Sequence, residues 1–157
     1  MSNLKPIIEE SMIQYSGAVL QNRALVDVRD GLKPSARQIL YCMYENKYLS
    51  NKPPQPTTGP IGDAMKSYYI HGDASCLGII MRAAQPFAMR YPLVNVKGNA
   101  GTLISSGNYA AARYTKSRLS PLGEYIFQGI EKETIQEWRE GIDESKHYPA
   151  ITPSKGF

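Results

Sequence analysis

The 157-residue sequence has no apolar run that approaches the ~20 residues a membrane-spanning helix needs. Residues 1–10 also lack the basic start and the apolar core of a signal peptide, so we expect a cytoplasmic protein. Hydrophobic residues make up 42% of the chain, which is enough to close the core of one domain of this size. The composition therefore predicts a folded, soluble domain.

Cysteine is scarce, with only Cys42 and Cys76 in the chain. Both lie in apolar surroundings without the spacing of metal ligands, which predicts reduced thiols in the core. The sequence also has no D-x-D or similar carboxylate cluster for a divalent metal, and no phosphate-binding loop or other ATP motif. We expect neither a metal site nor ATPase activity in this chain.

The basic charge is unevenly distributed. Residues 1–118 hold 14 Lys and Arg against 7 Asp and Glu, a balance of +7, whereas residues 119–157 hold 4 against 7, a balance of −3. A basic body suits a polyanionic partner, because Lys and Arg that displace counterions from phosphates give sequence-independent affinity. Many basic domains bind no nucleic acid, so charge alone leaves this open.

Hydrophobic spacing predicts a largely helical first half. Apolar residues recur at spacings of three and four over Leu4 to Ala24, and a second helix is expected from Pro34 to Tyr44. Four prolines in residues 50–62 predict an exposed loop. A short helix around Ile61 to Tyr69 and a longer one from an N-cap at Asp73 to about Gln85 then have the arrangement of a helix-turn-helix.

The pattern changes after this pair of helices. Short β-prone pieces between Tyr91 and Leu103 predict a β-wing, and a last long helix is expected from about Tyr109 to Trp138. The predicted fold class is α+β, mainly α: a winged-helix (CAP-like) domain with an N-terminal helix. The expected divisions are an N-terminal helical arm (1–30), the winged-helix domain (31–140) and an extended exit (141–157).

Four strings of the sequence carry a family resemblance. They are R-A-L-V-D-V-R-D-G-L-K-P from Arg23, I-H-G-D from Ile70, A-Q-P-F-A-M-R-Y-P-L-V from Ala84 and A-A-R-Y-T-K-S-R-L from Ala111. Their order and spacing resemble the breakage-reunion segment of the A subunits of bacterial DNA gyrase and topoisomerase IV. The resemblance implies a DNA gate of a type II topoisomerase that cleaves and rejoins DNA through a 5′-phosphotyrosyl intermediate.

The same resemblance implies that Tyr114 is the nucleophile and that Arg113 binds the scissile phosphate. A phenol with a pKa near 10 is a weak nucleophile at neutral pH, so its attack on a phosphodiester needs nearby cations. Arg113, Lys116 and Arg118 supply such cations close in sequence. The chain has 11 tyrosines, most of them expected to be packing or surface residues, and only its place in A-A-R-Y-T selects Tyr114.

His71 matches the family's histidine in I-H-G-D, where an imidazole can donate to phosphate or relay a proton. A structural role for a lone histidine is equally open. The remaining residues expected at the site are basic and contact DNA. They are Arg23, Lys33, Arg37, Lys66, Arg82, Arg90, Lys116 and Arg118.

Four positions depart from the family pattern. Tyr69 and Ala74 stand where the family has a histidine and a serine associated with quinolone binding, and Gly78 replaces an acidic residue that helps anchor the same drugs. Ala36 replaces another family histidine. We therefore expect weak quinolone sensitivity and a thinner cationic lining, which puts the cleavage rate in doubt but not the reaction type.

The resemblance also implies partners. A B subunit would supply the ATPase and the carboxylates that bind Mg²⁺, and two copies of each subunit would form an A2B2 enzyme with a symmetric DNA gate. Family A subunits are much longer, so we expect this chain to lack their tower, exit gate and wrapping domain. Two other readings are open: a winged-helix module that binds duplex DNA without cleaving it, and a protein-interaction domain for an acidic partner.

Overall fold

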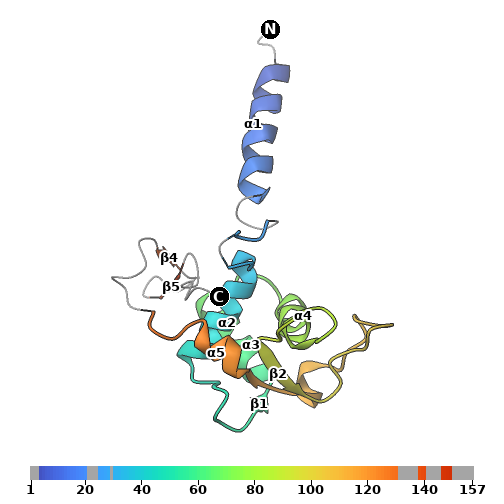
Figure 1. Cartoon of the computed structure of the whole chain (residues 1–157). Helices are drawn as coiled ribbons and strands as arrows, with labels where there is room; N and C mark the ends of the chain where they lie inside the picture. The colour runs from blue at the N-terminus through green and yellow to red at the C-terminus, as the bar shows by residue number, and fades with distance from the viewer. Residues whose placement is uncertain (1–3, 21–24, 29, 131–137, 141–145, 150–157) are drawn as a thin grey trace.

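The computed structural model describes residues 4–20, 25–28, 30–130, 138–140 and 146–149 (Figure 1). The elements in chain order are α1 (Leu4–Val19), α2 (Pro34–Glu45), β1 (Gln55–Pro56), α3 (Thr58–Ser67), α4 (Asp73–Ala84), β2 (Val94–Lys97), the 3-10 helix η2 (Ala112–Tyr114), β3 (Lys116–Leu119), α5 (Pro121–Tyr125), β4 (Trp138–Glu140) and β5 (His147–Pro149). A mainly helical body carries a three-stranded antiparallel sheet, and β4 and β5 pair as a separate two-stranded antiparallel sheet.

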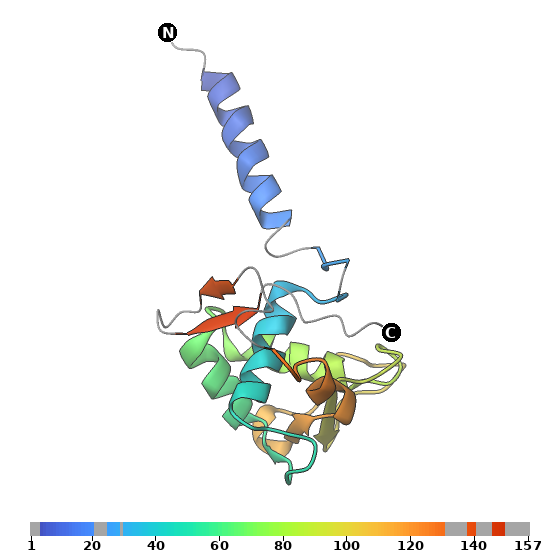
Figure 2. The ribbon, with the colours of Figure 1, turned by 60° about the vertical axis from the view of Figure 1, so that its left-hand side comes forward.

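Helices α2, α3 and α4 lie together in the body of the molecule (Figure 2). They share a core in which Ile39, Ala64 and Ile80 have no exposed surface. The helices predicted from Pro34 and from Asp73 are confirmed. The predicted loop ends earlier than expected, because α3 begins at Thr58 and accommodates its proline in the first turn. The N-cap of α4 is Gly72 and not Asp73, whose carboxylate instead accepts a hydrogen bond from the next residue of the first turn.

The sheet covers one end of this helical core. Its strand order is β1-β3-β2 and both pairings are antiparallel. Val94 of β2 lies opposite Leu119 of β3, and both side chains are buried against the helices. The predicted α+β, mainly α, winged-helix-like fold is therefore confirmed, with β2 inside the predicted wing.

The long helix predicted from Tyr109 to Trp138 is wrong. This part of the chain instead forms η2, β3 and α5, and Trp138 begins β4. Pairing of β3 with strands on both sides outweighs the helix propensity of the alanine run before Tyr114. Helix α5 then starts where Pro121 is at the first position and the Ser120 hydroxyl accepts a hydrogen bond from Gly123 N–H at 3.0 Å.

Helix α1 projects away from the body (Figures 1 and 2). The predicted helix is confirmed over Leu4–Val19, while residues 21–24 lie outside the described residues. Every side chain from Leu4 to Gly17 is exposed, so the apolar face of α1 is uncovered by the rest of the described chain.

The two cysteines are buried free thiols, as predicted. Burial raises the pKa of Cys42 and of Cys76 to about 12. Of the predicted extended exit, the structure describes only residues 146–149. There Lys146 pairs with Glu45 of α2 at 2.9 Å, beside β5.

Candidate active site

Tyr114 is the last residue of η2, and its side chain is 69% exposed. The backbone beneath it is held firmly. Thr115, which is buried, donates its hydroxyl to Thr57 Oγ1 at 2.9 Å, and Thr57 N–H donates to the carbonyl of Thr115 at 3.0 Å. The phenol is thus presented to solvent from a fixed turn.

Arg113 lies beside this phenol. The central carbon of its guanidinium is 4.8 Å from the centre of the Tyr114 ring. Both residues are exposed, so this side of the pair is open to a ligand. The arrangement places a permanent cation with a planar donor fork against the ring of the exposed tyrosine.

Gly98 supports the same turn from the end of β2, a role that sequence reasoning missed. Its φ is +123°, and a Cβ added there would lie 3.2 Å from the Tyr114 carbonyl oxygen and 3.1 Å from Thr115 Cγ2. Glycine is therefore needed both for the backbone conformation and for the close approach of the two segments.

The stretch of sequence that contains Tyr114 is basic. No Asp or Glu occurs between Asp73 and Glu124, a stretch that contains six Lys and Arg. Five of the six are exposed and one is half-buried. They are Arg82, Arg90, Lys97, Arg113, Lys116 and Arg118.

Lys97 is a cation that sequence reasoning missed. It lies directly opposite Lys116 in the β2–β3 register, and both side chains are exposed. Like charges in facing positions of an antiparallel pair destabilise the free protein. A polyanion bound over both would relieve that repulsion, so this pair favours a phosphate-rich ligand.

The other predicted DNA contacts divide by their surroundings. Lys33 and Lys66 are exposed at the start of α2 and in the last turn of α3. Arg118 donates to the carbonyl of Lys52 at 2.7 Å, so part of its fork is used inside the protein. Arg23 lies outside the described residues.

The prediction that Arg37 contacts DNA is wrong. Its side chain is 2% exposed and forms two hydrogen bonds with the carboxylate of Asp30, at 2.8 and 2.9 Å. The guanidinium also lies 3.3 Å from the Leu32 carbonyl. It is therefore not available to DNA. It instead fixes the turn that leads into exposed Lys33.

His71 is half-buried in the turn between α3 and α4, and its ring lies 5.2 Å from that of Tyr69. Tyr69 itself is only 5% exposed, so it does not replace the family's histidine with another donor at the surface. The catalytic role of His71 stays a prediction.

Gly78, which stands where the family has an acidic residue, lies close to the side chain of Tyr109. A Cβ at this position would lie 3.2 Å from the Tyr109 hydroxyl, so Tyr109 fills the space into which an acidic side chain would extend. The expected weak quinolone sensitivity stays a prediction.

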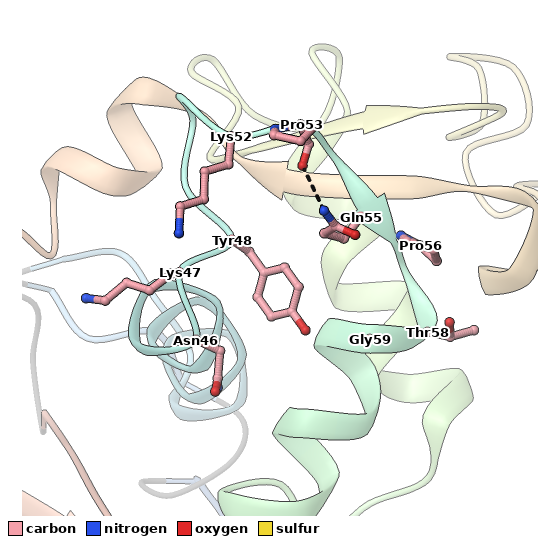
Figure 3. Close-up of a pocket in the computed structure, with 9 residues that line it drawn as sticks. All are labelled: Asn46, Lys47, Tyr48, Lys52, Pro53, Gln55, Pro56, Thr58 and Gly59. Atoms are coloured by element: carbon pink, nitrogen blue, oxygen red, sulfur yellow. Dashed lines mark hydrogen bonds between the residues drawn. The ribbon is translucent and has the colours of Figure 1, made fainter.

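A separate hollow of about 470 Å³ lies between the end of α2 and the start of α3 (Figure 3). Tyr48 projects into it and donates its hydroxyl to Asp63 at 2.6 Å. Burial, and then the bond to Asp63, raise the pKa of Tyr48. None of the predicted site residues lines this hollow.

Among the described residues, no three His, Cys, Asp or Glu side chains lie together as possible metal ligands. None of the described helices is both long and apolar enough to cross a membrane.

Fold and site together define a winged-helix-like domain that presents an exposed arginine–tyrosine pair on a basic surface. The model of the family described as the A subunit of DNA gyrase/topoisomerase IV matches residues 23–155, and the chain belongs to this family. It is 42% identical to the DNA gyrase A subunit of Thermotoga maritima over 96% of this chain, and 39% identical to that of Pseudomonas aeruginosa over 98%. The aligned regions are 19% and 16% of those relatives, so the chain spans less than a fifth of their length.

Proposed function

We propose that this chain is part of the DNA gate of a type II topoisomerase, in which Tyr114 breaks and rejoins a DNA strand. The observation that carries the proposal is the exposed Tyr114 phenol on a fixed turn, with the Arg113 guanidinium beside it. Family membership and the basic surroundings support the choice of DNA as the substrate.

The reaction is a transfer of one phosphodiester bond. The Tyr114 oxygen forms a bond to phosphorus, the bond from phosphorus to the 3′ oxygen breaks, and the phenol loses its proton while the leaving oxygen gains one. Arg113 stabilises the charge on the phosphoryl oxygens. The 5′-phosphotyrosyl product is a diester like the bond it replaces, so attack by the 3′-hydroxyl reseals the strand.

Other parts of the reaction need partners. We propose that a B subunit provides ATP hydrolysis and holds Mg²⁺, which would stabilise charge on the leaving oxygen, in an A2B2 enzyme acting on nucleoid DNA in the cytoplasm. The roles proposed for Tyr114 and Arg113 do not involve the metal. His71 is proposed to assist at the phosphate, because it lies in the turn before α4.

Covalent trapping tests the proposal. Duplex DNA labelled at its 3′ end is incubated with the chain, Mg²⁺ and a B subunit, then denatured. The expected result is a labelled protein–DNA adduct that Tyr114→Phe abolishes.

Tyr91→Phe is a matched control, because Tyr91 is 62% exposed and has the Arg90 guanidinium 5.7 Å from its ring. This variant should form the adduct like the wild type. An adduct that survives Tyr114→Phe, or maps to Tyr91, would contradict the proposal.

A non-cleaving DNA-binding module is the second candidate. It is favoured by the loss of two donors of the family pattern, because Ala36 and Tyr69 replace histidines. Salt-sensitive binding of duplex DNA without any adduct, in the presence of the B subunit, would select this function.

A further inference from the structure

Thr57 is the residue before α3, but its side chain does not cap this helix. A threonine in this position commonly accepts a hydrogen bond from a backbone N–H of the first helical turn. The Thr57 oxygen instead accepts the bond that the Thr115 hydroxyl donates at 2.9 Å, and the two side chains are 0% and 1% exposed. The hydroxyl that could stabilise α3 is therefore used to hold the residue that follows Tyr114.

Thr115 joins three segments of the chain through its side chain and backbone. Its hydroxyl lies 3.2 Å from the Ala112 carbonyl in η2, as well as near Thr57. A Cβ added at Gly98, at the end of β2, would lie 3.1 Å from its methyl group. Its carbonyl accepts from Thr57 N–H at 3.0 Å. The start of α3, the end of β2 and η2 thus meet at one buried side chain.

The Tyr114 phenol has little other support. Its side chain is 69% exposed, so water covers most of it and few protein atoms hold it. The backbone of residues 112–115 therefore largely sets where the phenol oxygen lies. Attack on a phosphodiester depends on this position, because a 1 Å misplacement of a reacting group can cost about 100-fold in rate.

Ser117 lies two residues beyond Thr115, and alternate residues of an extended strand face the same side. Ser117 has no exposed surface, and its hydroxyl has no hydrogen-bond partner in the part of the chain that the structure describes. One strand segment thus carries two buried hydroxyls, of which one is bonded to the start of α3 and the other is not bonded. Ser117 is therefore an internal comparison for Thr115.

We propose that Thr57 is a positioning residue for strand cleavage: its bond to Thr115 holds η2 so that the Tyr114 oxygen meets the phosphorus in line with the leaving oxygen. Thr57 is buried, so it acts through Thr115 and not on the DNA itself. A role in stability alone is less well supported, because the same hydroxyl would stabilise α3 directly as a cap. This role rests on the proposed function, since it requires that Tyr114 is the nucleophile.

Single-turnover cleavage tests this role. The full 157-residue chain is combined with a B subunit, Mg²⁺ and saturating duplex DNA labelled at its 3′ end, and the rate of adduct formation is measured. Thr57→Val keeps the branched shape of the side chain and removes its hydroxyl. This variant should cleave about 10- to 100-fold more slowly. Its affinity for DNA should change by less than about twofold, because no phosphate contact is removed.

The conservative variant and the control separate positioning from packing. Thr57→Ser retains the hydroxyl and should restore most of the wild-type rate. Ser117→Ala is the matched control, because it removes a buried hydroxyl that joins nothing, and it should keep the wild-type rate and melting temperature. The double variant Thr57→Val/Thr115→Val should be no slower than the slower single variant, because either change already breaks the bond.

The rate of adduct formation also separates this role from the proposed function itself. A folded Thr57→Val variant that cleaves at the wild-type rate would refute the positioning role and leave Tyr114 as the nucleophile. A loss of rate that Thr57→Ser does not restore, or that Ser117→Ala shares, would refute it as well. If Thr57→Val does not fold, equal rates for Thr57→Ala and Thr57→Ser would have the same meaning. A wild-type chain that forms no adduct would overturn both proposals.

Discussion

The buried ion pair between Asp30 and Arg37 allows a quantitative test of how the start of α2 is held. Both side chains are almost fully buried, at 4% and 2% exposure, and they share two hydrogen bonds. Asp30 also accepts from Leu32 N–H at 2.9 Å, so one carboxylate organises the whole turn. Asp30→Asn keeps the shape of this group but leaves a buried guanidinium without its counter-charge.

We expect Asp30→Asn to lower the free energy of unfolding by about 3 kcal/mol, the lower end of the range for breaking a buried pair from one side. Arg37→Met should cost a similar amount, because it leaves the carboxylate buried without its cation. The double variant should cost less than the sum of the two by about 2 kcal/mol, since it leaves no unpaired charge. Urea denaturation monitored by circular dichroism measures all three values.

The pair between Lys146 and Glu45 is the control. Its separation of 2.9 Å is equally short, but the two side chains are 39% and 32% exposed. Lys146→Met should therefore cost less than about 1 kcal/mol. If Asp30→Asn cost no more than this control, or if the two single costs simply added, the argument from burial would be refuted.

Three further predictions concern the sheet and α5. Gly98→Ala should destabilise the chain by about 1–3 kcal/mol, because the φ of residue 98 is +123° and the new Cβ would lie against the Tyr114 backbone. It should also reduce adduct formation. Thermal melts measure the loss of stability, and covalent trapping measures the adduct. Lys97→Ala should lower the slope of log affinity against log salt by about 1 and slightly raise the melting temperature of the free chain, since repulsion from Lys116 is removed; an unchanged slope would contradict a phosphate contact. Hydrogen bonds from Ser50 lower the pKa of Glu124. Their contribution to the stability of the fold should therefore be present at neutral pH and be lost as the pH falls through that lowered pKa. The difference in melting temperature between wild type and Ser50→Ala should shrink from pH 7 to pH 3.

The helical core was predictable because its signals are local. The apolar residues of α2 and α4 recur at helical spacing, and Pro34 marks where α2 begins. The predicted start of α4 was one residue late at its N-cap, which is Gly72 and not Asp73. Tyr114 and Arg113 were identified from a motif, and the structure adds their exposure and proximity. The structural role of Arg37 could not be predicted in the same way, because an arginine in a helix is usually exposed to solvent. Its buried partner, Asp30, lies seven residues earlier in a turn and is known only from the structure.

The error in β3 shows how a mistake in secondary structure becomes a mistake in a site. A helix over this segment would have placed Arg113 and Lys116 on one face, as neighbours three residues apart. In the strand, Lys116 and Arg118 alternate with buried Ser117 and Leu119. The cation that faces Lys116 is Lys97, 19 residues away in sequence. Because such a partner is set by strand register, the positive surface beside Tyr114 could be assembled only once the pairing of β2 with β3 was known.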